Sequence, residues 1–318
     1  MSSSKIRRRT FLASGLAAGV SLPGGPVAAA TGLLAPRLIR RATVVCGGVD
    51  SGRPILGFCH IGPASSMLTP SLRGLLSKYG LAPIVAASMD RLSPGDVARR
   101  VATIGHSVPD TLVLLGDCRR PDDLERLVGL VEALQDLRGP DLFVIAALPR
   151  STADAPRIER LVDRCDGVIG LQHAVQGRDL DRALVAAAHS LLDGLYIHGF
   201  IGYDHADLFT VMHAAGVFAF GLGRSSHGTL HAADQALLEV ERQGIDLSRV
   251  CSVHMGFSGD ADTTLVEISD LAARVQARIS DSAHVMFYAT IKQELRGQVE
   301  VSLLAAIERR RPLARRGR

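Results

Sequence analysis

Apolar residues in the first half of the chain form short continuous runs, separated by longer stretches in which apolar and polar positions mix at helical spacing. Continuous apolar runs are typical of parallel strands that are covered on both faces of a sheet. The predicted strands are 42–48, 54–61, 82–88, 111–115, 142–147 and 167–171, and the predicted helices are 65–79, 93–104 and 121–137. This alternation predicts a doubly wound, Rossmann-like α/β domain over residues 42–178.

A long helix rich in Ala and Leu is predicted over residues 179–196, and it separates two parts of different pattern. Beyond it the pattern predicts helices 204–214, 229–243 and 263–279, together with strands 217–222, 250–257, 284–290 and 298–304. We therefore expect an α/β domain, a central helix over residues 179–199, and a smaller α+β domain over residues 200–308.

Charge is distributed unevenly, because the two ends are basic and the body is acidic. The chain carries 36 Lys and Arg and 32 Asp and Glu, for a formal net charge of +4. Residues 1–41 hold seven basic residues and residues 309–318 hold six, with no acid in either segment, so 23 basic residues face 32 acidic ones in between. A basic leader and a basic tail on an acidic body favour an anionic membrane surface as a contact and argue against nucleic acid as a partner. Solvated ends are the alternative explanation.

Residues 1–30 have the order of a secretory signal: a basic segment, a short apolar run, and small residues suited to a peptidase. The segment RRRTFL at residues 7–12 resembles a twin-arginine signal, which has two Arg followed by a spacer and Phe-Leu. If the leader is such a signal, we expect export or tethering at the inner membrane. If it is a basic extension, we expect a cytoplasmic protein.

Other site chemistries find little support in the sequence. The five cysteines are scattered without a CxxC pair, so neither a disulfide framework nor a zinc site is predicted. His227 and His231 are four residues apart near a predicted helix start, but no carboxylate stands at metal-ligand spacing, and no metal site is predicted. Aromatic residues make up 4% of the chain and Trp is absent, which argues against a stacking surface for single-stranded nucleic acid.

The segment DHADLFTVM at residues 204–212 resembles the catalytic loop and the following helix of the FtsZ/tubulin superfamily. Further segments resemble later parts of the same pattern in the same order: GVFAFGLGR at 216–224, TLHAADQALL at 229–238, CSVHMGFSGD at 251–260 and LRGQVEVSLL at 295–304. The resemblance implies a divergent FtsZ-like fold, with a Rossmann-like parallel-sheet domain, a long central helix, and then a smaller α+β domain.

Two carboxylates of this loop carry the functional part of the resemblance. In the family they face the nucleotide of the next subunit and polarise the attacking water, so the resemblance implies catalytic roles for Asp204 and Asp207. Oxygens with that role must lie within hydrogen-bond reach of the nucleophile. Asp at a helix start is also favoured by N-capping and by the helix dipole, so a purely structural role is the alternative.

The phosphate-binding loops of the family are degenerate in this chain. The family's Gly-rich signature would follow the predicted strand 111–115, where the sequence is GDCRRPDD with Gly116 as the sole glycine. Glycines let backbone N–H groups approach phosphate closely, and carboxylates repel it. The first loop has Gly62 after strand 54–61, or the earlier pair Gly47 and Gly48. These four glycines are the candidate GTP-contacting positions, and Mg²⁺ is expected only if GTP binds.

Three functions follow from these expectations. The first is an FtsZ-like protein that associates with itself or with an FtsZ-type filament, as a pseudo-GTPase in which GTP binding and hydrolysis are lost or much reduced. The second is an active GTPase of the FtsZ type, in cell division or membrane remodelling. The third is an exported α/β binding protein on a repurposed fold.

Overall fold

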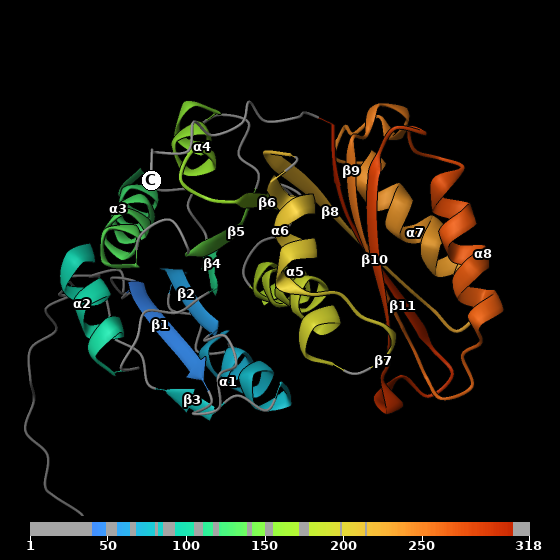
Figure 1. Ribbon diagram of the computed structural model, residues 1–318, viewed down its shortest axis with the longest axis horizontal. Helices are drawn as coiled ribbons and strands as arrows, with labels where there is room; N and C mark the ends of the chain where they lie inside the picture. The colour runs from blue at the N-terminus through green and yellow to red at the C-terminus, as the bar shows by residue number, and fades with distance from the viewer. Residues whose placement is uncertain are drawn as a thin grey trace, which may run out of the picture. The chain divides into compact units, whose positions relative to one another are not determined.

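Strands and helices alternate along the first part of the chain, as the sequence predicts (Figure 1). The computed structural model describes residues 40–48, 56–63, 68–79, 82–84, 93–104, 111–116, 121–138, 142–149, 155–171, 178–197, 199–213 and 215–307. The first elements are β1 (Arg40–Gly48), β2 (Leu56–Pro63), α1 (Leu68–Lys78), β3 (Ala82–Ile84), α2 (Pro94–Ile104), β4 (Thr111–Gly116), α3 (Pro121–Arg138), β5 (Phe143–Pro149), α4 (Ala155–Val162) and β6 (Gly167–Leu171).

The central helix α5 (Arg178–Tyr196) follows, one residue longer at its start than predicted. The remaining elements are β7 (Gly199–Ile201), α6 (His205–His213), β8 (Val217–Ser225), α7 (Thr229–Glu241), β9 (Ser252–Gly259), α8 (Leu265–Gln276), β10 (His284–Ile291) and β11 (Val299–Ala306). Short 3₁₀ turns lie at Leu247–Arg249 and Gln293–Leu295.

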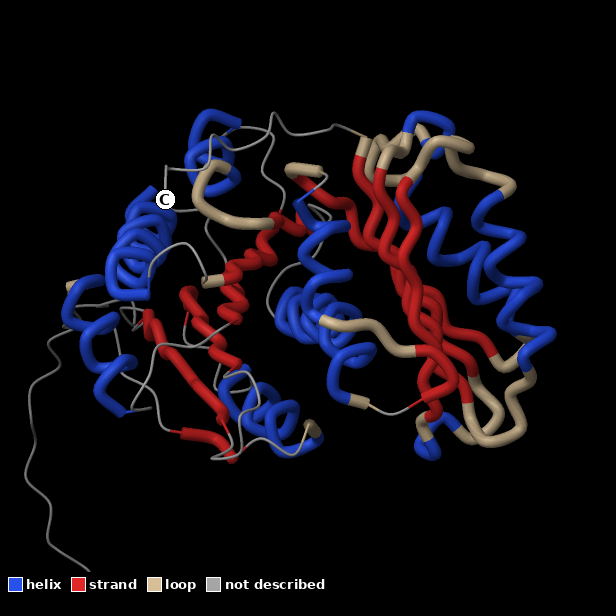
Figure 2. Tube along the Cα trace, in the orientation of Figure 1, coloured by secondary structure: helices blue, strands red, loops and turns tan. Residues whose placement is uncertain are grey.

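One mixed sheet joins both parts of the chain, and its strands are the red segments of Figure 2. The strand order is β3-β1-β2-β4-β5-β6-β8-β11-β9-β10-β7. Strands β2, β4, β5, β6 and β8 pair in parallel. Strand β1 is antiparallel to both β2 and β3, which corrects the expectation of a wholly parallel first sheet. Strands joined by a short connection can pair only antiparallel, because a parallel pair needs a long crossover, and seven residues separate β1 from β2.

The first part is layered as the continuous apolar runs predict, and β4, β5 and β6 are buried along their length. Successive residues of β4 point to opposite faces, so Leu112 and Leu114 pack with α2 and α3 while Val113 and Leu115 pack with α1 and α5. Each face of these strands is therefore closed by helices.

The second part places α7 and α8 on one face of its strands and α5 and α6 on the other (Figure 1). Gly221 and Gly223 of β8 permit the close approach of α7. A Cβ on Gly221 would lie 2.2 Å from the carbonyl oxygen of Ala236, and a Cβ on Gly223 would lie 1.9 Å from that of Ala232. The glycines of the segment GLGR therefore serve helix packing in this fold.

Two elements, α4 and β7, were not predicted from the sequence. Helix α4 has eight residues in a polar stretch, and β7 has three residues. Elements this short offer too few positions for a periodic pattern. The leader and the tail, predicted as 1–41 and 309–318, lie outside the described residues, apart from Arg40 and Arg41, which begin β1. None of the helices in the described ranges has the length and apolar composition needed to cross a bilayer.

Candidate functional site

The predicted carboxylates Asp204 and Asp207 lie together at the start of α6, and both are exposed. The backbone N–H of Asp207 donates to Oδ1 of Asp204 at 2.9 Å, and the backbone N–H of Asp204 donates to Oδ2 of Asp207 at 3.2 Å. This is the reciprocal arrangement of a capping box, in which each side chain satisfies a backbone donor of the other residue. The pair forms a compact acidic turn at the protein surface.

The predicted phosphate-contacting glycines fall into two groups at opposite ends of β2. Ile61 of β2 pairs with Gly116 of β4, so Gly62 and Gly116 lie side by side at the carboxyl ends of two parallel strands. Gly47 pairs with Leu56 at the other end of β2, in an antiparallel ladder. Six residues of strand correspond to about 20 Å, so Gly47 and Gly48 are too far away to share a ligand with Gly62.

The helix that follows β4 begins with acidic residues. Asp122 and Asp123 occupy the first turn of α3, where an anion would benefit most from the helix dipole. Asp122 is exposed and Asp123 is buried. Carboxylates there oppose a phosphate electrostatically. Residues 117–120 of the same connection lie outside the described residues.

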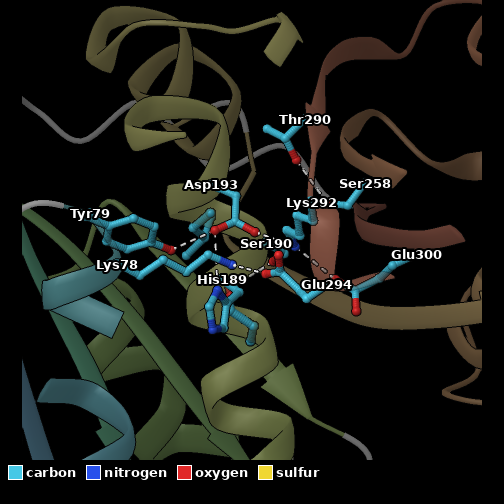
Figure 3. A network of polar contacts seen from close by, with 12 residues as sticks. Lys78, Tyr79, His189, Ser190, Asp193, Ser258, Thr290, Lys292, Glu294 and Glu300 are labelled. Carbon is cyan, nitrogen blue, oxygen red and sulfur yellow. Dashed lines mark hydrogen bonds and ion pairs between the residues drawn. The ribbon is translucent and has the colours of Figure 1, made fainter. Parts of the chain in front are cut away.

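A buried polar network that the sequence did not point to lies on α5, centred on Asp193 (Figure 3). Asp193 has no exposed surface. Its Oδ1 accepts from the hydroxyl of Tyr79 at 2.9 Å and lies 3.3 Å from Nδ1 of His189, and its Oδ2 lies 2.7 Å from Nζ of Lys292. Figure 3 shows Asp193 between Tyr79 on one side and Lys292 on the other. The carboxylate thus connects the end of α1 with the end of β10.

The network continues outward through alternating charges. Nζ of Lys292 lies 3.3 Å from Oε1 of Glu300 on β11, and Glu300 is paired at 2.6 Å with Arg224 on β8. A separate exposed pair joins Lys78 and Glu294 at 3.1 Å, one residue before Tyr79 (Figure 3). The end of α1 is therefore joined to the β10–β11 connection in two ways: by the exposed ion pair of Lys78 and Glu294, and through the buried carboxylate of Asp193.

The pKa shifts in this network follow from burial and pairing. Burial alone would raise the pKa of Asp193, but the hydrogen bond from His189 and the charge of Lys292 lower it to about 2. Burial alone would lower the pKa of Lys292, but Asp193 and Glu300 raise it above its ordinary value. Both groups are charged at neutral pH, as a buried ion pair requires.

The sequence carried only a weak signal for this network. Asp193 is a single carboxylate among buried Leu and Ala positions of α5, with Leu192 before it and Leu191 one further back. An ionisable residue on the apolar side of a helix calls for a partner, but nothing local identifies one, since Tyr79 is 114 residues away.

The histidine pair considered as a metal site does not gather further ligands. The rings of His227 and His231 lie 6.0 Å apart, edge to face. In the described ranges no three His, Cys, Asp or Glu side chains come together in a way that suits a metal ion.

Sequence comparison places the resemblance in the second part of the chain. Residues 215–307 match the C-terminal domain of the FtsZ family. The cell division protein FtsZ of Wolbachia pipientis is 28% identical over 127 residues, which cover 39% of this chain and 40% of that protein. The same protein of Rickettsia conorii is 30% identical over 129 residues, which cover 39% of this chain and 28% of that protein. The chain thus matches less than half the length of these relatives.

Structural comparison extends the likeness to about two thirds of the chain. An empty FtsZ dimer from M. jannaschii superposes with a TM-score of 0.56 at 20% identity, covering 67% of this chain and 68% of that one. CetZ from Methanosaeta thermophila gives a TM-score of 0.53 at 13% identity, covering 68% of each chain. The fold is therefore an α/β fold with a mixed sheet that matches FtsZ, and residues 215–307 are similar in sequence to the C-terminal domain of the FtsZ family.

Proposed function

We propose that this protein acts by association, either head to tail with itself or with an FtsZ-type filament, and that its GTP binding and hydrolysis are lost or much reduced. The observation that supports association is the exposed acidic turn of Asp204 and Asp207. A head-to-tail contact joins two different surfaces, and repeating it yields an open filament. The acidic turn supplies one of the two surfaces.

Exposed aromatic side chains near this turn in the sequence support the assignment. Phe200 of β7 is 49% exposed and Phe209 of α6 is 40% exposed, on either side of the turn in sequence. Large apolar side chains left in water are unfavourable unless a partner covers them, and aromatic residues are enriched at interfaces. The name of one similar structure, an FtsZ dimer without ligand, supports self-association as the kind of contact.

The loss of GTP chemistry is supported by the sequence and by the surroundings of the glycines. Gly62 and Gly116 lie together at strand ends, but the helix after Gly116 begins with Asp122 and Asp123. Two carboxylates at a helix N-terminus compete with phosphate for the same partial positive charge.

Sedimentation of the purified full-length chain tests the association. We expect assembly that grows with protein concentration and does not depend on GTP or Mg²⁺. The double variant Asp204→Asn/Asp207→Asn keeps an acceptor oxygen on both side chains and removes both charges, so we expect the fold to persist and assembly to weaken at least tenfold.

The chain offers a matched control for this variant. Thr264 and Glu267 form the same reciprocal capping box at the start of α8. Glu267→Gln removes an exposed charge from an equivalent cap and should leave assembly unchanged. A full-length chain that stays monomeric at every concentration would refute the proposal.

A nucleotide titration separates the pseudo-GTPase from the active GTPase. The side-by-side placement of Gly62 and Gly116 is a described feature that favours the active enzyme. We expect no saturable GTP binding up to millimolar concentration with Mg²⁺ present. Saturable binding that Gly116→Val abolishes, accompanied by phosphate release, would establish the active GTPase instead.

A further inference from the structure

Tyr203 stands immediately before the acidic turn and packs into the junction of α5 and the sheet. Its ring lies against Gly194 of α5, where a Cβ would come within 2.3 Å of Cε1 of Tyr203. Its ring also contacts Tyr288 on β10 with centroids 5.8 Å apart, and His254 on β9 with centroids 5.3 Å apart. The absence of a side chain at Gly194 is thus a requirement for this position of the ring.

The hydroxyl of Tyr203 makes two hydrogen bonds in a defined direction. It donates to the backbone carbonyl of Leu191 on α5, and its oxygen lies 3.0 Å from Nε2 of His254. Because the carbonyl can only accept, the tyrosine proton is used there, and His254 must donate from Nε2. His254 is fully buried, and burial lowers its pKa to about 3, so the imidazole is neutral with its proton on Nε2.

The backbone of Tyr203 adds a third attachment to the same helix. Its N–H donates to the carbonyl oxygen of Gly194 at 3.4 Å, in the last turn of α5, where carbonyls lack partners within the helix. Side chain and backbone of one residue therefore hold the chain to α5 and β9 directly before Asp204. The next residue then has little freedom in where it points its carboxylate.

We propose that Tyr203 is the positioning residue of the acidic turn: with His254 and the end of α5 it sets where Asp204 and Asp207 face a neighbouring molecule. This inference rests on the proposed function, in which the turn forms one surface of the contact. In this proposal Tyr203 acts through the adjacent turn.

The variant Tyr203→Phe tests the inference, because it keeps the ring on Gly194 and removes only the two hydroxyl contacts. Loss of the two buried hydrogen bonds corresponds to roughly a tenfold effect or more, so we expect the concentration needed for assembly to rise at least about tenfold. Amide hydrogen exchange at Asp207, whose N–H donates to Asp204, should accelerate by a similar factor. In ¹⁵N spectra, the chemical shift of His254 Nε2 should change in Tyr203→Phe, because this variant removes the hydroxyl next to that nitrogen.

Tyr288→Phe is the matched control. Tyr288 is buried in the same junction, and its hydroxyl is directed to Ser302 on β11 and not to the turn. This variant loses a buried hydroxyl of the same kind, and we expect amide exchange at Asp207 and assembly to stay as in the parent chain. Equal effects of both variants would mean that Tyr203 is merely structural.

The outcomes for the two proposals can be told apart. If Asp204→Asn/Asp207→Asn abolishes assembly and Tyr203→Phe does not, the association stands and the positioning role is overturned. If the parent chain does not assemble at all, the proposed function fails, and unchanged amide exchange at Asp207 in Tyr203→Phe would overturn the positioning role independently.

Discussion

The carboxylates Asp193 and Asp204 stand eleven residues apart, one near the end of α5 and the other just before α6, in opposite environments. Asp193 has no exposed surface and contacts groups from α1, α5 and the end of β10. Asp204 is exposed, and its described hydrogen bonds are local ones, with Asp207 and with the backbone N–H of Leu208. The first carboxylate joins distant segments of the chain, whereas the second is free to meet another molecule.

The difference shows how burial decides what a carboxylate does. A buried carboxylate costs several kcal/mol in lost hydration unless charges and hydrogen bonds replace the water, so Asp193 needs all its partners in place. An exposed carboxylate keeps its water and contributes little beyond its cap. We therefore expect changes at Asp193 to act on folding, and changes at Asp204 to act on association.

Removing the partner of the buried carboxylate should have the largest effect. Lys292→Met leaves Asp193 charged and without its ion pair at 2.7 Å, which we expect to lower the free energy of unfolding by about 3–5 kcal/mol. Urea denaturation followed by circular dichroism measures this. The double variant Asp193→Asn/Lys292→Met keeps an acceptor for Tyr79 without a buried charge, and much of the loss should be recovered.

The exposed pair one residue from Tyr79 is the control for this experiment. Lys78→Met removes the ion pair with Glu294, which lies at the surface, and we expect the free energy of unfolding to fall by at most about 1 kcal/mol. If Lys78→Met and Lys292→Met cost the same, the contrast between buried and exposed charge would not hold in this protein.

As the pH falls, we expect His254 to lower the stability of the folded chain at a higher pH than Asp193 does. His254 has its pKa lowered to about 3 by burial, whereas an unfolded His titrates near 6.5, so the unfolded chain takes up a proton that the folded chain refuses. The stability that this residue contributes is fully present above about pH 6.5 and is lost as the pH falls toward 3. Between pH 7 and pH 5 we expect a loss of about 2 kcal/mol from this residue.

The variant His254→Phe should remove most of that slope between pH 7 and pH 5, as urea titrations at the two pH values would show. The half-buried His205, whose pKa is lowered by burial, adds a smaller contribution of the same sign and accounts for a remainder. Asp193, with a pKa of about 2, loses its contribution only below about pH 4. An unchanged slope in His254→Phe would contradict the assignment of the neutral, buried imidazole.

The fold could be predicted because its signals are local. Continuous apolar runs predicted β4, β5 and β6 to within two residues at each end, and the Ala- and Leu-rich stretch predicted α5. The antiparallel direction of β1 is not encoded in its apolar run, which has the same composition in either direction. It follows from the short connection to β2 once the two strands are known to pair. The pairing of β6 with β8 also depends on how the chain returns after α5 and α6, which no local pattern encodes.

The site residues also separate into those placed by local structure and those placed by long-range packing. The family resemblance of residues 204–212 pointed to Asp204 and Asp207, and three residues of helix start bring the two together without help from the rest of the chain. The partners of Asp193 come from the ends of α1 and β10, and those of Tyr203 from α5 and β9. Contacts of this range exist only after the sheet and the helices have packed, so the sequence could show the residues but not the network.

The smallest expected changes in stability are those at the exposed turn, and they test the comparison of Asp193 with Asp204 from the Asp204 end. Asp204→Ala removes the acceptor for the Asp207 N–H, and loss of such a cap costs about 1 kcal/mol, whereas Asp204→Asn keeps the cap and should cost a few tenths at most. Thermal unfolding of the two variants measures this difference. Because assembly depends on the charge and stability on the cap, Asp204→Asn should weaken assembly while leaving the unfolding temperature unchanged. A stability loss in Asp204→Asn as large as that of Lys292→Met would show that the turn belongs to the folded core, and its assignment as an association surface would then fail.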